Sequence, residues 1–160
     1  MKDSDYYFMN EAIKEAQKAY NTGEVPVGAV VTIDKVIVAK AHNQVERLRD
    51  ATAHAEILAI TSASDYLGSK YLKDCYMYAT LEPCHMCAGA MYWTQLGRVV
   101  YGADDKKRGF SQVNHKILHP STSVTANVMA HECSRLITTF FAGLRFKCTQ
   151  ANPKYGNNDA

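Results

Sequence analysis

The sequence has no long apolar run, no internal repeat and no low-complexity tract among its 160 residues. No segment reaches the roughly 18 consecutive apolar residues of a membrane helix. The first ten residues, MKDSDYYFMN, also lack the apolar core of a secretory signal peptide. With 47% hydrophobic and 21% charged residues, the composition is ordinary for one globular domain. We therefore expect a cytoplasmic protein with no membrane partner, one domain over 1–148 and a polar tail over 149–160.

The sequence also lacks an even number of cysteines. It has five, which are Cys75, Cys84, Cys87, Cys133 and Cys148. An odd number in a protein expected in the cytoplasm argues against a disulfide framework. The close pair in TLEPCHMC then has three interpretations, which are a metal site, a redox pair and plain core packing.

No strong excess of charge of one sign is present, since the formal net charge is only +2. Basic residues nevertheless gather in DDKKRGF, which holds Lys106, Lys107 and Arg108, and Arg145 follows near the end of the chain. Solvated surface and a basic helix end explain such runs as well as contact with nucleic acid does.

Hydrophobic periodicity and turn residues predict nine elements. A first helix runs from a cap at Ser4 to Gly23, and a second follows a cap at Asp50 or Thr52. A third helix starts at Pro83 and stops at Gly97, and a fourth starts at Met129. The predicted strands are 25–33, 35–42, 75–81, 98–103 and 123–127, and polar loops are predicted over 43–50 and 104–121.

The resulting order, α-β-β-α-β-α-β-β-α, predicts an α/β fold in which helices cover both faces of a mixed sheet, a three-layer α/β/α sandwich. In open sheets of this kind, functional groups collect near the starts of helices that follow strands. Two candidate motifs, HAE and PCHMC, fall at such helix starts.

Thiolate and imidazole groups are the ligands that zinc prefers. Cys84 and Cys87, three positions apart in the first turn of a helix, present both thiols to one side. His54, also near a helix start, is the best third ligand. Three protein ligands leave one position open, as in a catalytic zinc site. A closed structural site with Cys75 or His85 as fourth ligand is the alternative.

Glu56 stands two residues after His54, so it faces a different side of a helix and need not bind the same metal. A carboxylate there suits a proton shuttle between an attacking water and a leaving group. The combination H-x-E followed by P-C-x-x-C is the signature of the zinc deaminases.

Several blocks of the sequence resemble, in order, those of the bacterial tRNA-specific adenosine deaminases, within the cytidine-deaminase-like superfamily. They are GEVPVGAVV, AHN, DATAHAEILAI, TLEPCHMCAGAM, GRVVYGADDKKRG, LHP and ECSRLITTFF. The resemblance extends over roughly residues 6–145. It implies a mixed five-stranded sheet, one zinc per chain, a homodimer, and conversion of adenosine to inosine at the wobble position of a tRNA anticodon.

The resemblance also implies roles for single residues. His54, Cys84 and Cys87 match zinc ligands, and Glu56 matches the proton shuttle. Asn43 matches a residue that hydrogen-bonds the target base, although a turn residue after the hairpin would look the same. Pro26 and Val27 match the pocket wall, and they also suit the core of a strand.

A second group of residues matches positions near the RNA in the family. Asp105 belongs to a loop near the target nucleotide, and Lys106, Lys107 and Arg108 are placed to hold anticodon phosphates. Phe141 and Arg145 match the C-terminal helix that borders the RNA. Phe141 is the stacking candidate, because the adjacent Phe140 lies on the apolar stripe of this helix.

Two other functions compete with tRNA editing. The first is deamination of a free nucleobase or nucleoside, guanine or cytosine, by the same zinc chemistry, since MYWTQ resembles guanine deaminases. The second is a non-catalytic zinc module that binds RNA. Glu56 argues against the second, because a binding module needs no carboxylate beside an open zinc position.

Overall fold

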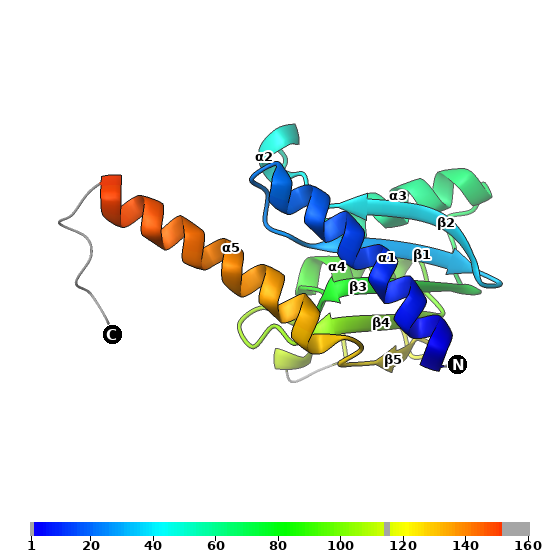
Figure 1. Cartoon of the computed structure of the whole chain (residues 1–160). Helices are drawn as coiled ribbons and strands as arrows, with labels where there is room; N and C mark the ends of the chain where they lie inside the picture. Colours follow the sequence, from blue (N-terminus) through cyan, green and yellow to red (C-terminus); the bar gives the residue numbers. More distant parts are fainter. Residues whose placement is uncertain (1, 114–115, 152–160) are drawn as a thin grey trace.

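A five-stranded mixed sheet forms the centre of the computed structural model, which describes residues 2–113 and 116–151 (Figure 1). The strands are β1 (Gly28–Ile33), β2 (Val36–His42), β3 (Cys75–Leu81), β4 (Arg98–Ala103) and β5 (Ser123–Thr125). Their order across the sheet is β2-β1-β3-β4-β5. β1 is antiparallel to β2 and β3, whereas β3, β4 and β5 are mutually parallel.

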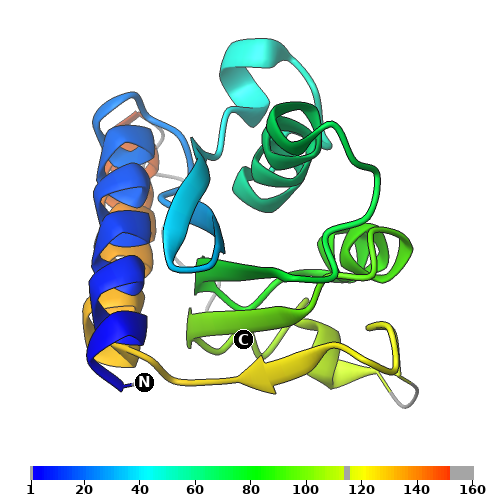
Figure 2. The same cartoon turned by 90° about the vertical axis from the view of Figure 1, so that its right-hand side faces the viewer.

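Helices cover both faces of this sheet, so the predicted three-layer α/β/α sandwich is confirmed. Figure 2 shows α1 (Lys2–Asn21) and α5 (Ala130–Ala151) on one face, and α3 (Ala55–Leu67) and α4 (His85–Trp93) on the other. Alternation along each strand divides the core accordingly, because successive side chains point to opposite faces. Val30, Tyr78 and Val100 pack toward α1 and α5. The preceding or following residues, such as Val31 and Met77, pack toward α3 and α4.

Small residues let the helices approach the sheet closely. A Cβ on Gly28 would lie 2.0 Å from the carbonyl oxygen of Ala12 in α1. A Cβ on Gly102 of β4 would lie 2.4 Å from Sγ of Cys133 in α5. Cys133 is buried at this contact, and burial raises the pKa of its thiol to about 12. These features indicate that Cys133 acts in packing.

Several predicted helix boundaries are wrong, and one is the start of the third helix, which lies at His85 and not at Pro83. α1 already includes Lys2, so Ser4 lies inside it. Asp50 and Thr52 form their own turn, in which Oδ1 of Asp50 accepts hydrogen bonds from the backbone and the hydroxyl of Thr52, and α3 therefore starts only after His54. The third predicted helix, α4, ends at Trp93 because the chain turns through Gln95, which has a φ of 52°.

The predicted loop over 43–50 contains a short helix, α2 (Val45–Leu48), and the loop over 104–121 contains the 3-10 helix η1 (Phe110–Gln112). α5 continues beyond the edge of the sheet at which β3 and β4 end (Figure 1). The predicted tail over 149–160 lies largely outside the described residues, so that boundary stays a prediction. In the described part of the chain, no helix combines the length and the apolar character needed to cross a membrane.

Candidate metal centre and active site

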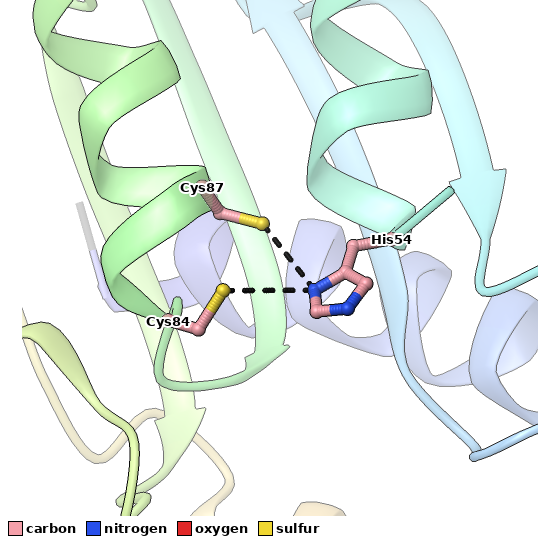
Figure 3. A group of neighbouring side chains, drawn as sticks. All are labelled: His54, Cys84 and Cys87. Carbon is pink, nitrogen blue, oxygen red and sulfur yellow. Dashed lines mark hydrogen bonds between the residues drawn. The ribbon is translucent and has the colours of Figure 1, made fainter. Parts of the chain in front are cut away.

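Three side chains from distant parts of the sequence point toward one another between the starts of α3 and α4 (Figure 3). His54 immediately precedes α3, Cys84 immediately precedes α4, and Cys87 lies in the first turn of α4. Nδ1 of His54 lies 3.6 Å from Sγ of Cys84 and 3.6 Å from Sγ of Cys87. All three ligand atoms lie within 4.8 Å of one another, so one ion would reach them together.

The local sequence explains where these side chains lie. Pro83 disfavours helical backbone at the residue before it, so β3 leads into an extended turn and α4 begins only at His85. Cys84 and His54 are the N-cap residues of α4 and α3, and both have the extended backbone typical of that position, with φ −71° and ψ 172° for Cys84 and φ −69° and ψ 151° for His54. The two helices thus present their ligands from matching positions at their N-terminal ends.

The three residues fit a zinc ion. Ideal tetrahedral zinc has Zn–S of about 2.3 Å and Zn–N of about 2.0–2.1 Å, which separates a ligand sulfur from a ligand nitrogen by about 3.5–3.6 Å. Both N···S distances in the site lie in this range. Among the described residues, no fourth protein ligand joins the group, so a fourth position stays open, as a catalytic site requires. The predicted alternative of a closed site with Cys75 or His85 is therefore not supported.

The thiols are prepared for metal binding. The hydrogen bond that Cys84 accepts from Cys87 lowers the pKa of Cys84 to about 4, against the opposing effect of burial, and the hydrogen bond from His54 acts in the same direction as that from Cys87. The same contact with Cys84, together with burial, raises the pKa of Cys87, and the hydrogen bond to Cys84 raises the pKa of His54. The pair thus shares one proton, which a cation would displace as it binds both sulfurs.

Glu56 lies in the first turn of α3 and is 3% exposed. Desolvation by burial raises the pKa of its carboxyl to about 7, although His54 acts in the opposite direction. Its Oε2 atom has no hydrogen-bond partner within the described chain. A buried polar oxygen without a partner is costly, so such an atom beside three metal ligands marks a place for a water or a substrate group.

Pro26 and Val27, predicted as pocket wall, and Asn43, predicted to hydrogen-bond the target base, are all buried. Val27 belongs to the core cluster that also contains Cys87, and its carbonyl oxygen accepts a hydrogen bond of 3.0 Å from the backbone of Asn43. The side chain of Asn43 donates through Nδ2 to Glu24, over 3.3 Å. The alternative, that Pro26 and Val27 form the core of a strand, is wrong in its placement, because both are buried but precede β1, which begins at Gly28. Their role as pocket wall stays a prediction.

The basic loop, residues 104–111, lies across the turn between β3 and α4. Gly109 forms an isolated antiparallel bridge with the zinc-ligand candidate Cys84, and the backbone of Phe110 donates to the carbonyl of Pro83. The half-buried Asp105 caps the turn that follows it, because its Oδ1 accepts the backbone N–H groups of Lys107 and Arg108. Lys106, Lys107 and Arg108 are exposed, and the charge of Arg108 lowers the pKa of His54 against the larger effect of Cys84.

Phe141 and Arg145 lie apart from the metal centre, on the exposed outer half of α5. Phe141 is 40% exposed, whereas Phe140 contacts Tyr20 of α1 with ring centroids 5.9 Å apart. The prediction that Phe140 packs and Phe141 is available for stacking therefore agrees with the structure. The assignment of Phe141 and Arg145 to RNA stays a prediction.

Two glutamates beside the site were not predicted. Glu24 is buried and accepts hydrogen bonds from the side chain of Asn43 and from the backbone N–H groups of Glu46 and Arg47, both in α2. Glu82 is buried and accepts hydrogen bonds from the backbone of Asp105 and Ser111. The available signal was a lone carboxylate inside the apolar segments GEVPVG and TLEPC.

Comparisons with known proteins agree with this geometry. Residues 2–103 match the family described as the cytidine and deoxycytidylate deaminase zinc-binding region. The chain is 42% identical over 144 residues to a tRNA-specific adenosine deaminase of Aquifex aeolicus (strain VF5), covering 87% of this chain and 95% of that protein.

Solved structures extend the likeness to three dimensions. One, from work on A-to-I editing by tRNA:A34 deaminases at the wobble position of transfer RNA, superposes with a TM-score of 0.77 at 36% identity, covering 81% of this chain and 98% of the other. Guanine deaminase from Bacillus subtilis is 41% identical, but it covers only 61% of this chain and 63% of its own, with a TM-score of 0.59. The chain belongs to the tRNA-specific adenosine deaminases, within the zinc-binding cytidine and deoxycytidylate deaminase family.

Proposed function

We propose that this protein hydrolyses adenosine to inosine at the wobble position of a tRNA anticodon and releases ammonia. The observation that carries the proposal is the unpartnered, buried carboxylate oxygen of Glu56 beside three ligands that fit a zinc ion. Neither a structural zinc nor an RNA-binding module requires such an oxygen. The editing activity of the relatives supports the choice of substrate.

His54, Cys84 and Cys87 would hold the zinc, which supplies the Lewis acidity that activates a water for attack on C6 of adenine. Glu56 takes a proton from that water and passes it to the ring nitrogen next to C6. A second proton follows through Glu56 to the departing amino group, which leaves as ammonia while C6 keeps the oxygen. A carboxylate buried beside the zinc ligands is placed both to accept a proton from the water and to return it to the substrate.

Asn43 is proposed to recognise the base. Because one N–H of Nδ2 donates to Glu24, the second N–H and the Oδ1 atom of the carboxamide are the groups proposed to contact the base. Pro26 and Val27 would form the apolar wall against the ring. An anticodon loop is single-stranded, so the target base reaches this pocket at a smaller cost than a base in a duplex does.

The RNA outside the target base is proposed to contact Lys106, Lys107 and Arg108 through phosphates, and Phe141 and Arg145 on α5. We also propose that the protein works as a homodimer in the cytoplasm. Exposed aromatic residues on α4, Tyr92 and the 77% exposed Trp93, are compatible with a subunit contact. Light scattering on the purified protein measures the assembly directly, and a monomeric mass would remove the dimer from the proposal.

The decisive experiment measures ammonia release by the zinc-loaded protein on four substrates. They are an anticodon stem-loop with a wobble adenosine, free adenosine, guanine and cytosine. Turnover of the stem-loop alone is expected. The guanine arm tests the second candidate, which the partial likeness to guanine deaminase favours. Turnover of guanine alone would retain the zinc chemistry and replace the substrate.

Cys87→Ala tests the metal assignment in the same assay. Cys87 supplies one of three ligands, so its loss should lower zinc content well below one per chain and abolish turnover. Elemental analysis measures the metal, and Cys133→Ala, which removes a buried thiol outside the centre, is the matched control. Unchanged zinc in Cys87→Ala would contradict the ligand assignment.

A further inference from the structure

Glu82 is a buried carboxylate that the deamination chemistry does not use. It lies between the end of β3 and Pro83, two residues before Cys84, and is 2% exposed. Its Oε2 atom accepts the backbone N–H of Asp105 over 3.0 Å, and Oε1 accepts that of Ser111 over 2.9 Å. Both bonds go to the basic loop, at positions on either side of Lys106, Lys107 and Arg108.

The loop is shaped to receive this carboxylate. A Cβ on Gly109 would lie 2.3 Å from Cδ and 2.3 Å from Oε2 of Glu82, so the loop backbone lies directly against the carboxylate at the one residue without a side chain. Gly109 has a φ of −59°, which any residue adopts, so the glycine is needed here for close approach. Asp105 completes the loop by accepting the N–H groups of Lys107 and Arg108.

We propose that Glu82 is a positioning residue that holds the basic loop, residues 104–111, as a preformed cradle for phosphates of the bound RNA. This inference rests on the proposed function. Two backbone hydrogen bonds close the loop at its base, so three exposed cations stand next to the metal centre without a large entropic cost on binding. The carboxylate oxygens of Glu82 accept hydrogen bonds from peptide N–H groups inside the protein, and the buried side chain does not face the RNA.

The first test compares Glu82→Gln with the wild type in binding and turnover of the stem-loop. A glutamine offers one acceptor oxygen and sets an amide NH₂ against the second backbone N–H, so the loop should be released at one end. We expect KM and the dissociation constant to rise about tenfold near physiological salt, with kcat and zinc content nearly unchanged. Affinity falls as salt rises, and this dependence should become weaker in the variant. The magnitude of the slope of log affinity against log salt, between about 50 and about 200 mM, should decrease by about 1 to 2, because each phosphate contact to a single strand contributes about 0.7.

Gly109→Ala tests the same contact from the loop side and keeps the carboxylate. The added methyl group displaces the loop from Glu82, so this variant should show the same loss of salt dependence. Tyr78→Phe is the matched control, because it removes a buried 3.0 Å hydrogen bond to Asp5 on the opposite face of the sheet. We expect Tyr78→Phe to keep the wild-type salt slope.

A double-mutant cycle separates positioning from general loss of stability. In a background in which Lys106, Lys107 and Arg108 are all alanine, Glu82→Gln should add no further loss of affinity, since there is no basic cradle left to position. Hydrogen exchange of the free protein should show faster exchange over 104–111 in both Glu82→Gln and Gly109→Ala. A full additional loss in the triple-alanine background would overturn the inference, as would an unchanged salt slope in both variants.

The outcomes distinguish this inference from the function on which it rests. Stem-loop turnover by the wild type, together with wild-type salt dependence in both variants, keeps the function and rejects the role of Glu82. Absence of stem-loop turnover by the wild type rejects the function and the inference with it.

Discussion

Glu56 follows the proposed ligand His54 by two residues, Glu82 precedes the proposed ligand Cys84 by two, and the two are almost equally buried, with exposed fractions of 3% and 2%. Their surroundings differ in one respect. Oε2 of Glu56 has no partner within the described chain, whereas both oxygens of Glu82 accept backbone N–H groups. A carboxylate that transfers protons keeps an oxygen without a hydrogen-bond partner, and this lowers the stability of the protein. A carboxylate that positions a loop has its hydrogen bonds supplied by the backbone of that loop. The comparison predicts opposite results for the same substitution at the two positions.

Glu56→Gln should produce the largest effect on activity. The amide cannot carry protons, so we expect kcat to fall by about 10²- to 10⁴-fold, with zinc content unchanged. Removing a buried carboxyl whose pKa is already raised by burial should not lower the melting temperature. Single-turnover rates, elemental analysis and calorimetry measure the three quantities, and a variant that keeps its rate would remove the proton role.

Glu82→Gln should reverse this pattern. Turning a satisfied acceptor into a donor that opposes a backbone N–H should reduce the free energy of unfolding by about 1–3 kcal/mol. The single-turnover rate at saturating RNA should stay close to that of the wild type. Equal melting temperatures for Glu82→Gln and Glu56→Gln would break the comparison, because the two sites would then be satisfied to the same degree.

Glu24 sharpens the comparison, because one of the hydrogen bonds that its carboxylate accepts comes from Asn43, a proposed substrate-binding residue. Glu24→Gln leaves the carboxamide of Asn43 without its charged acceptor, so KM for the stem-loop should rise about fivefold, corresponding to about 1 kcal/mol. This increase should disappear when Asn43 is already alanine. Persistence of the full effect in Asn43→Ala would show that Glu24 acts through α2 alone.

Glu11 gives the smallest expected effect, because its carboxylate is satisfied by lysine side chains. Hydrogen bonds with Lys14 and Lys40 lower the pKa of Glu11 below its ordinary value of 4.5. Its contribution to stability is therefore present above pH 4.5 and is lost as the pH falls through the lowered pKa. Glu11→Gln should reduce the loss of unfolding free energy at acid pH by less than about 1 kcal/mol and leave activity at neutral pH unchanged. Melting temperatures measured over a series of acid pH values give this loss for the variant and the wild type. If the variant loses stability with falling pH as steeply as the wild type does, the acid sensitivity belongs to other carboxyl groups.

Local sequence predicted the parts of the protein that depend on short-range chemistry. His54, Glu56, Cys84 and Cys87 belong to two motifs in which each member is within three residues of its neighbour. Helix starts after Pro83 and Thr52 were predicted to within a few residues, since proline and turn-forming side chains act on adjacent backbone. The order of helices and strands then gave the three-layer arrangement.

Tertiary structure alone decided how those motifs meet and what surrounds them. Glu82 was only a lone carboxylate in an apolar segment until folding placed backbone N–H groups from 23 and 29 residues away around it. The short helix α2 depends in the same way on Glu24, which accepts the backbone N–H of Arg47 from 23 residues away. Spacing along the chain determined which residues could bind a metal, and long-range hydrogen bonds determined which buried carboxylate was left free to react, because burial and partnership exist only in the folded chain.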